Sequence, residues 1–130
     1  MISALCHVAG GTPGVELDEF ATLAYGVKFM SQSDDYSGAT MTGPTVPSEY
    51  KQETKKKSRL GRHVIVGTNS VIFPGVDVAD GCSIGAMSLV TRSTEAWGIY
   101  VGAPARRLKD RKKDLLDLEC AYLAAEARSA

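Results

Sequence analysis

Hydrophobic residues recur every six positions through the second half of this chain. Six hexads are led by Leu60, Val66, Ile72, Val78, Ile84 and Val90. The residue four places after each leader is small or β-branched: Val64, Ser70, Val76, Cys82, Ser88 and Thr94. A period of six matches neither the 3.6-residue repeat of a helix nor the simple alternation of a strand. It is typical of a hexapeptide repeat, in which each hexad supplies one short strand and one corner of a triangular coil.

The first part of the chain keeps the same period less clearly. Its leaders are assigned as Leu5, Gly11, Leu17, Leu23 and Phe29. Three hexads make one turn, so each leader is expected to stack on the leader 18 positions later, Leu5 beneath Leu23 and Val66 beneath Ile84. Burying an aliphatic leader contributes about 1.5–3 kcal/mol before entropy is subtracted. The second inward residue of each hexad is small because a larger one would overpack the narrow interior.

Two segments depart from the period. Residues 35–59 are rich in Gly, Pro and polar residues, and the hexads resume directly after them. They are therefore interpreted as a loop extruded from a coil corner, and long loops of this kind often carry function. From Ala105 onward, apolar residues fall three or four apart, which predicts a helix. The sequence thus predicts an all-β parallel β-helix over residues 1–104, with the inserted loop 35–59, and a C-terminal helix over 105–130.

Composition narrows the class of protein. The chain of 130 residues fits one domain, and its 15 acidic and 15 basic side chains balance, which argues against a nucleic-acid or membrane-surface partner. It contains no long apolar run and no secretory leader, so we expect a cytoplasmic protein without membrane insertion. Cys82 holds an inward position and is expected to be a buried thiol. The coil starts almost at Met1, which would leave the backbone edge of the first coil uncovered. We therefore expect either that the chain is a natural short form or that another element covers this edge.

From residue 60 to 109 the sequence resembles the left-handed β-helix acyltransferases. The resemblance rests on four segments: Pro74-Gly75-Val76, Ile84-Gly85-Ala86, Val90-Thr91-Arg92 and the closing Gly102-Ala103-Pro104-Ala105-Arg106. Residues 33–38, Ser-Asp-Asp-Tyr-Ser-Gly, and the GPTVP that follows are similar to a subgroup that acetylates O-antigen and other surface sugars. The resemblance implies a left-handed coil, a homotrimer, and acetyl-CoA as co-substrate.

The resemblance also implies which residues contact coenzyme A. Six positions match: Thr68 and Ala86 for the pantetheine arm, Thr91 and Arg92 for the adenosine end, and Arg106 and Lys109 for the phosphates. Cations are suited to the phosphates, since Arg presents a planar fork of donors to an anion. The alternative interpretation is that the basic residues are ordinary surface charges.

The general base is where the sequence departs from the family. The family normally places a His where the loop leaves the coil, but this chain has Asp34 and Asp35 there. An Asp, with a pKa near 3.9 against about 6.5 for His, is the weaker base, although two adjacent carboxylates raise one pKa. The same residues are also good turn formers. His7, expected to stack against Tyr25 near a subunit interface, is the other candidate base.

The sequence as a whole favours an acetyl-CoA-dependent O-acetyltransferase that acts on a hydroxyl of a sugar or glycan precursor. With two histidines and no ligand spacing, no metal is expected. The alternative is a non-catalytic trimer that keeps the scaffold without the base. The absent His favours the second interpretation, whereas the basic residues near the C-terminal end of the coil favour the first.

Overall fold

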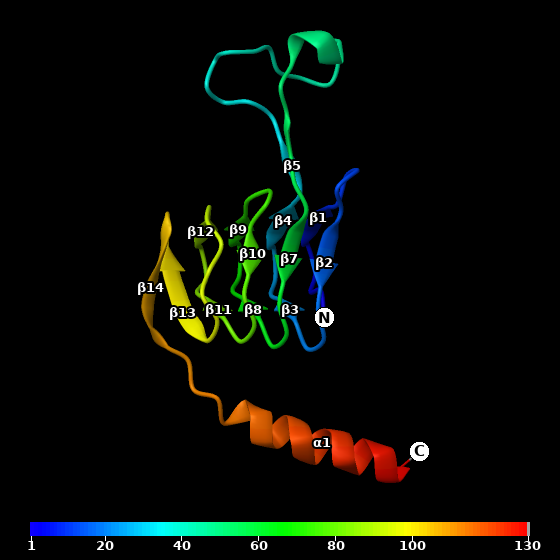
Figure 1. Ribbon diagram of the computed structural model, residues 1–130, viewed down its shortest axis with the longest axis vertical. Helices are drawn as coiled ribbons and strands as arrows, with labels where there is room; N and C mark the ends of the chain where they lie inside the picture. Colours follow the sequence, from blue (N-terminus) through cyan, green and yellow to red (C-terminus); the bar gives the residue numbers. More distant parts are fainter. Residues whose placement is uncertain (130) are drawn as a thin grey trace.

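The computed structural model describes residues 1–129 and shows a three-sided coil of short strands, followed by one helix (Figure 1). The sides are three sheets that the chain visits in turn. Sheet A contains β3 (Thr22–Leu23), β8 (Ile65–Val66), β11 (Ser83–Ile84), β13 (Gly98–Gly102) and β14 (Ala105–Asp110). Sheet B contains β1 (His7–Ala9), β4 (Lys28–Met30), β9 (Val71–Ile72) and β12 (Leu89–Val90). Sheet C contains β2 (Val15–Leu17), β7 (Ser58–Leu60) and β10 (Asp77–Val78).

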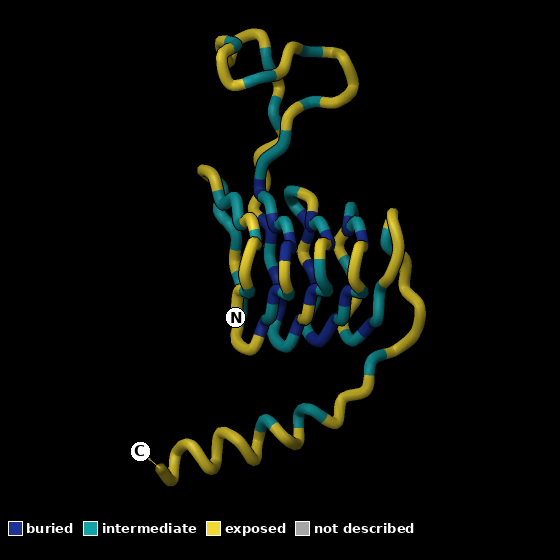
Figure 2. Tube along the Cα trace, turned by 180° about the vertical axis from the view of Figure 1, so that it is seen from behind, coloured by how far each residue is buried: buried dark blue, intermediate teal, exposed yellow. Residues whose placement is uncertain are grey.

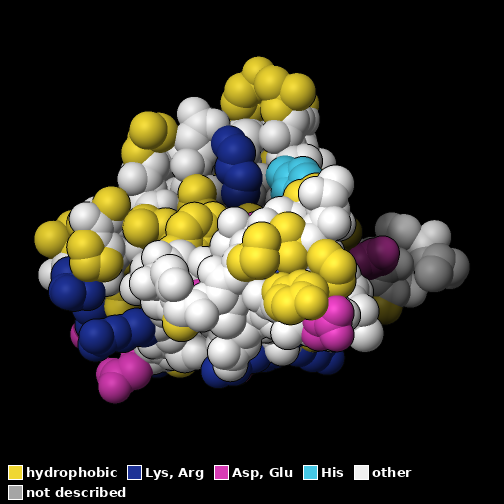
Figure 3. Space-filling model, turned by 90° about the horizontal axis from the view of Figure 1, so that it is seen from above, with side chains coloured by type: hydrophobic (Ala, Val, Ile, Leu, Met, Phe, Trp, Pro, Cys, Tyr) yellow, Lys and Arg dark blue, Asp and Glu magenta, His cyan; other side chains and the backbone are white. Residues whose placement is uncertain are grey.

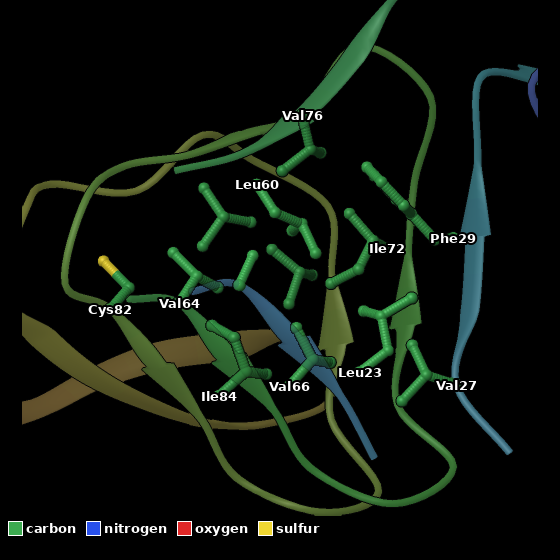
Figure 4. Packing of buried hydrophobic residues seen from close by; sticks show 13 residues of the cluster. Leu23, Val27, Phe29, Leu60, Val64, Val66, Ile72, Val76, Cys82 and Ile84 are labelled. Carbon is green, nitrogen blue, oxygen red and sulfur yellow. The ribbon is translucent and has the colours of Figure 1, made fainter. Parts of the chain in front are cut away.

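The predicted leaders of the second half form the core. Leu23, Val66 and Ile84 pair in parallel register on sheet A, and all three side chains are buried inside the coil (Figure 4). The residue four places after a leader also faces the interior. Val64, Val76 and Cys82, which follow the leaders Leu60, Ile72 and Val78, are buried. The stacking of Val66 on Ile84 and the burial of the Cys82 thiol are therefore confirmed.

Serines take some of the inward positions without leaving a buried hydroxyl unpaired. The Oγ of Ser70 donates to the Gly85 carbonyl at 2.9 Å, and the Oγ of Ser58 donates to the Met30 carbonyl at 2.8 Å. The first bond joins one coil to the next, and the second closes the corner from which the inserted loop leaves. Satisfying the hydroxyl removes the penalty of burying it, so a small polar residue fits this narrow interior as well as an apolar one.

The register predicted for the first coil is wrong. Ile2 pairs with Leu23, and Val8 pairs with Phe29, 21 positions on. Leu5 is an exposed corner residue with a φ of 57°. The cause is the glycine-rich turn at residues 10–14, which lengthens the first coil by about three residues and displaces any count made backwards from Leu17.

The inserted loop leaves the coil between sheets B and C. Its stem is an antiparallel pair, β5 (Gln32–Ser33) with β6 (Thr54–Lys55), and a short 3₁₀ helix, η1 (Ser48–Tyr50), lies near its tip. The loop projects away from the coil (Figure 1). The coil resumes at Ser58, slightly before the predicted end of the loop at residue 59.

The C-terminal helix predicted from Ala105 begins later. Residues 105–110 form β14 instead, which turns back and pairs antiparallel with β13. This pairing covers what would otherwise be an open sheet edge, and that tertiary gain overrides the helical spacing of the apolar residues. The helix α1 is Leu115–Ser129, so the coil with its closing hairpin extends to Asp110.

Candidate active site

The corners between sheets A and B bring Thr68 and Ala86 together. A Cβ on Gly67 would lie 2.5 Å from the Ala86 nitrogen, so the two corners stack backbone to backbone. The Thr68 carbonyl accepts a hydrogen bond from the Met87 amide at 2.8 Å. Ala86 is exposed. A ligand lying across this corner meets main-chain groups with little side-chain bulk in the way.

Basic side chains of the closing hairpin extend along sheet A from this corner. Gly85 lies against Val101, and Val101 is paired with Arg106 on β14. Lys109 is paired with Ile99 further along the strand. Both basic residues are exposed, and neither forms an ion pair with any residue in the described range 1–129.

Arg107, between them, faces a different way. Its guanidinium lies 5.9 Å from the centre of the Tyr100 ring and 2.7 Å from the Asp110 carboxylate. These partners raise the pKa of Arg107, the Asp110 carboxylate contributing most. Because Arg107 is engaged within the chain, Arg106 and Lys109 are the cations of β14 that remain for an external anion.

Apolar side chains complete this corner. Tyr25 and Met87 are large, and 50% and 69% of their surfaces are exposed. The Tyr25 carbonyl accepts a hydrogen bond from the Asn69 amide, which fixes successive corners against each other. Exposed apolar groups and main-chain groups at the corner, with Arg106 beside them and Lys109 further along sheet A, suit a ligand with a mainly apolar arm and an anionic end.

The six predicted coenzyme A residues do not all lie at one corner. Thr91 and Arg92 follow β12 and lie at the corner between sheets B and C. The strand of sheet B therefore separates them from Ala86, which precedes it. Arg92 is exposed. Within one chain, the structure groups Thr68, Ala86 and Arg106 at this corner, with Lys109 toward the other end of sheet A. It places Thr91 and Arg92 on the side of the loop.

A hollow at the base of the loop contains the predicted carboxylates. It is lined by Ser33, Asp34, Asp35, Tyr36, Thr54, Phe73 and Pro74. Seen from the side that bears the loop, hydrophobic side chains are exposed in several separate patches (Figure 3). Tyr36 is 90% exposed. Sequence reasoning missed Tyr36 and Phe73, although a large aromatic residue at an outward corner or loop position was a visible signal.

The two carboxylates have different surroundings. Asp35 accepts hydrogen bonds from the Ser37 amide and the Thr40 hydroxyl, each at 2.9 Å. These donors, Ser37 foremost, hold the pKa of Asp35 below its ordinary value. Asp35 therefore serves as the turn residue of the loop. The Asp34 carboxylate is exposed in the hollow and accepts no hydrogen bond from residues 1–129, so it is the one available to a ligand.

The predicted position of His7 is wrong in one respect. Its register partner is Lys28, not Tyr25, because the first coil is longer than 18 residues. His7 lies exposed on the outer face of sheet B. It is on β1, whereas the carboxylates follow β5, so the chain does not assemble His7 and Asp34 into one site.

His63 is engaged elsewhere. Its ring stacks on Phe20 with centroids 4.9 Å apart, and its Nε2 lies 3.0 Å from a Glu119 oxygen. Within residues 1–129, no three His, Cys, Asp or Glu side chains are grouped as a metal site would require. In the same range no helix is long and apolar enough to cross a membrane.

Comparison with known proteins gives specific relatives, although no family model matches the chain. The dTDP-4-amino-4,6-dideoxy-D-glucose acyltransferase of Escherichia coli is 37% identical over 112 residues, which cover 86% of this chain and 58% of that protein. A probable macrolide acetyltransferase of Lysinibacillus sphaericus is 32% identical over 109 residues, covering 75% of this chain and 61% of that protein. The chain thus spans about three fifths of the length of these curated relatives.

Solved structures give a consistent result. AntD, an N-acyltransferase from Bacillus cereus in complex with dTDP and 3-hydroxybutyryl-CoA, superposes with a TM-score of 0.95 at 39% identity, over 97% of this chain and 67% of that one. A galactoside acetyltransferase in complex with coenzyme A shares the fold, with a TM-score of 0.62 at 19% identity, over 78% of this chain and 48% of that one.

Proposed function

Because the chain belongs to the hexapeptide-repeat acyltransferase family, we propose that it transfers an acyl group from an acyl-CoA to the amino group of a nucleotide-linked sugar. The relatives support this choice. The E. coli protein is a dTDP-amino-sugar acyltransferase, and AntD has been crystallised with dTDP-4-amino-4,6-dideoxyglucose and coenzyme A. The acceptor proposed here is an amine, in place of the sugar hydroxyl that the sequence favoured.

The residues at the loop exit are the observation that carries the proposal. A sugar hydroxyl needs a base to remove its proton during attack, and the exposed group here is the weakly basic Asp34 carboxylate. An amine is nucleophilic once neutral and does not need a strong base. A carboxylate is suited to hold an amino group by charge and hydrogen bonding, so Asp34 fits an amino sugar better than a neutral one.

The chemistry of the transfer places few demands on the protein. The bound ammonium first gives one proton to solvent. The neutral amine nitrogen then attacks the thioester carbonyl, the carbon–sulfur bond breaks, and the second proton lost by nitrogen ends on the departing sulfur. Asp34 positions the nitrogen, and Tyr36 and Phe73 offer flat apolar surfaces to the rest of the acceptor. Orientation of the two reactants supplies much of the rate, because it replaces a bimolecular encounter by an oriented pair.

For the donor, we assign the corner between sheets A and B. Arg106 and Lys109 bind the phosphates, and the main chain at Thr68 and Ala86 contacts the pantetheine arm. Thr91 and Arg92 border the loop side, so they join the same donor only across two copies of the chain. This is one reason to propose a homotrimer with the donor between subunits. The relatives compared here are acyltransferases, which gives no support to a non-catalytic scaffold.

The test uses a matched pair of acceptors. The protein is given acetyl-CoA with dTDP-4-amino-4,6-dideoxyglucose, or with the analogue that has a hydroxyl in place of the amine. We expect an amide product from the first and at least a hundredfold slower reaction of the second, measured by free thiol release and mass spectrometry. Equal rates, or transfer to the hydroxyl alone, would overturn the amino-sugar assignment.

An Asp34→Asn variant then tests the site. The substitution keeps the size of the side chain and removes its charge, so turnover of the amino sugar should fall about 10²-fold while coenzyme A affinity stays unchanged. Glu49→Gln, in the projecting loop away from the hollow, is the control and should retain parental turnover. Unchanged turnover in Asp34→Asn would remove Asp34 from the site.

A further inference from the structure

The corners between sheets C and A carry large flat side chains. Phe20, His63 and Trp97 occupy the same corner of different coils, with φ values of 62°, 59° and 60°. The corners between sheets A and B have the same left-handed conformation, as Met87 shows with a φ of 60°, so it belongs to the corner geometry of this coil. In the coil between His63 and Trp97 the same position is Gly81, and the Trp97 ring lies over it. We call Phe20, His63 and Trp97 the aromatic column, because their rings follow one another along this corner of the coil.

Helix α1 crosses beneath the coil and reaches this column at three points (Figure 1). Just before the helix, the Lys113 ammonium lies 5.6 Å from the centre of the Trp97 ring. In the second turn, Glu119 contacts His63. One turn further, Tyr122 meets the Phe20 ring edge to face, with centroids 6.3 Å apart. The helix and the segment before it therefore touch coils that do not adjoin one another.

Glu119 is the one charged side chain of the helix that is largely covered. Its side chain is 10% exposed, and its two carboxylate oxygens contact Arg62 and His63. Glu19 and Arg111 are the other charged groups at this place: Glu19 contacts Arg62, and Arg111 donates to the His63 carbonyl at 2.6 Å. No residue of α1 is buried, and its residues from Cys120 to Ser129 are all exposed (Figure 2). The helix is thus held by a few side chains around one carboxylate.

We propose that α1 is a strap that holds the corners of separate coils together, fastened by Glu119 to Arg62 and His63. In a repeat structure each coil contacts its neighbours alone, so a coil at one end fluctuates independently of the other. An element that spans the aromatic column couples them. The strap also continues from β14, and Arg111, which lies between the two, donates to the carbonyls of His63 and Gly81. The strap therefore steadies the strand that carries Arg106 and Lys109, a consequence for donor binding that rests on the proposed function.

Hydrogen exchange on the full chain tests the strap without any substrate. The variant Glu119→Gln removes the charge and keeps the shape of the side chain. We expect amides of α1 and of corners 18–21 and 61–64 to exchange at least tenfold faster, while β9 and β12 stay protected. Glu126→Gln, on the same helix and in no ion pair among residues 1–129, is the matched control and should exchange like the parent.

A second variant separates the strap from a local charge effect. Tyr122→Ala removes the contact to Phe20 and leaves Glu119 in place, so it should release the same corner at 18–21. The single Trp97 reports the other end through its fluorescence. If Glu119→Gln and Tyr122→Ala leave exchange within twofold of the parent, or if Glu126→Gln accelerates it equally, the strap is refuted. Acceleration confined to α1, with both corners unchanged, would equally refute it.

Discussion

Gly81 lies at a corner where the next coil leaves no room for a side chain. Its φ is 75°, and a Cβ placed on it would come within 2.2 Å of the Trp97 ring. Gly14 has a similar φ of 82°, but nothing lies within 4 Å of the place where its Cβ would be. A side chain at either position would strain the backbone, but only at position 81 would it also clash with a neighbour.

The substitution Gly81→Ala should therefore destabilise the protein more than Gly14→Ala. Left-handed strain costs about 1–2 kcal/mol for any residue with a side chain. Overpacking against Trp97 adds about 1–3 kcal/mol at position 81 alone. Urea unfolding followed by circular dichroism measures both differences. Equal losses of unfolding free energy at the two positions would mean that the Trp97 ring moves aside at no cost in stability.

Arg106 and Lys109 differ from their neighbour Arg107 in having no carboxylate partner within residues 1–129. Replacing both by Gln should weaken coenzyme A binding by about tenfold or more, since each charge-assisted hydrogen bond to phosphate contributes about 1.5–3 kcal/mol before solvent screening. Calorimetry at two salt concentrations measures the effect, which should shrink as salt rises. A pantetheine fragment without the nucleotide should bind the variant and the parent alike. Lys112→Gln, just beyond β14, is the control, and an equal loss there would point to a diffuse charge effect.

At the scale of elements, the hexads were predictable because their cause is local. Each leader such as Val66 or Ile84 faces inward wherever one hexad follows another without interruption. The first coil broke this rule, since the turn at residues 10–14 adds length that no period records. The sequence did not predict strand β14 for another reason. The spacing of Leu108 and Leu115 indicated a helix, whereas the strand forms because it pairs with β13, a contact that the spacing does not record.

The site was predictable in its residue types and less so in its arrangement. The position of Asp34 at the loop exit followed from counting hexads from Phe29. That Asp35 is tied to Ser37 and Thr40 depends on the conformation of the loop, which the sequence does not determine residue by residue. Arg92 and Arg106 are separated because they lie at different corners of the coil, and the order of the strands in the sheets determines those corners.

The attachment of α1 should depend on acid. His63 first, and Arg62 with it, hold the pKa of Glu119 below its ordinary value. A carboxylate whose pKa is lowered by an interaction stabilises that interaction fully above its free pKa and loses it as the pH falls through the lowered one. We therefore expect α1 to remain attached at neutral pH and to detach only as the pH falls below the range in which a free Glu titrates.

Exchange of α1 amides between pH 6 and pH 3, corrected for intrinsic rates, measures this detachment. In Glu119→Gln the acid-dependent step should be absent, because the group that titrates has been removed. Glu126→Gln should keep it. A step of the same size in Glu119→Gln would assign the titration to another carboxylate.

At the scale of the whole molecule, the outer faces of sheets B and C differ in polarity. On sheet C the outward residues in register are Glu16, Arg59 and Asp77, and Arg59 forms ion pairs along this face, including one of 2.9 Å to Asp77. On sheet B the outward residues in register are His7, Lys28, Val71 and Leu89, so this face is apolar in the later coils. A charged face is stable in water, whereas an apolar face of a short coil gains stability when a second copy covers it.

We therefore expect a closed assembly of three identical chains that covers sheet B. Identical subunits related by rotation bury the same surfaces in each, and closure leaves no open end for further growth. Sedimentation equilibrium at micromolar concentration should give about three times the chain mass of 13.8 kDa. Val71→Glu should shift the protein toward monomer, because it places a charge on the face that becomes buried while the inward Ile72 keeps the coil folded. Asp77→Ser, on sheet C, should leave the mass unchanged. A Val71→Glu protein that still sediments as a trimer would exclude sheet B as the interface, and a parent that sediments as a stable monomer would exclude the assembly and, with it, a donor site shared between two chains.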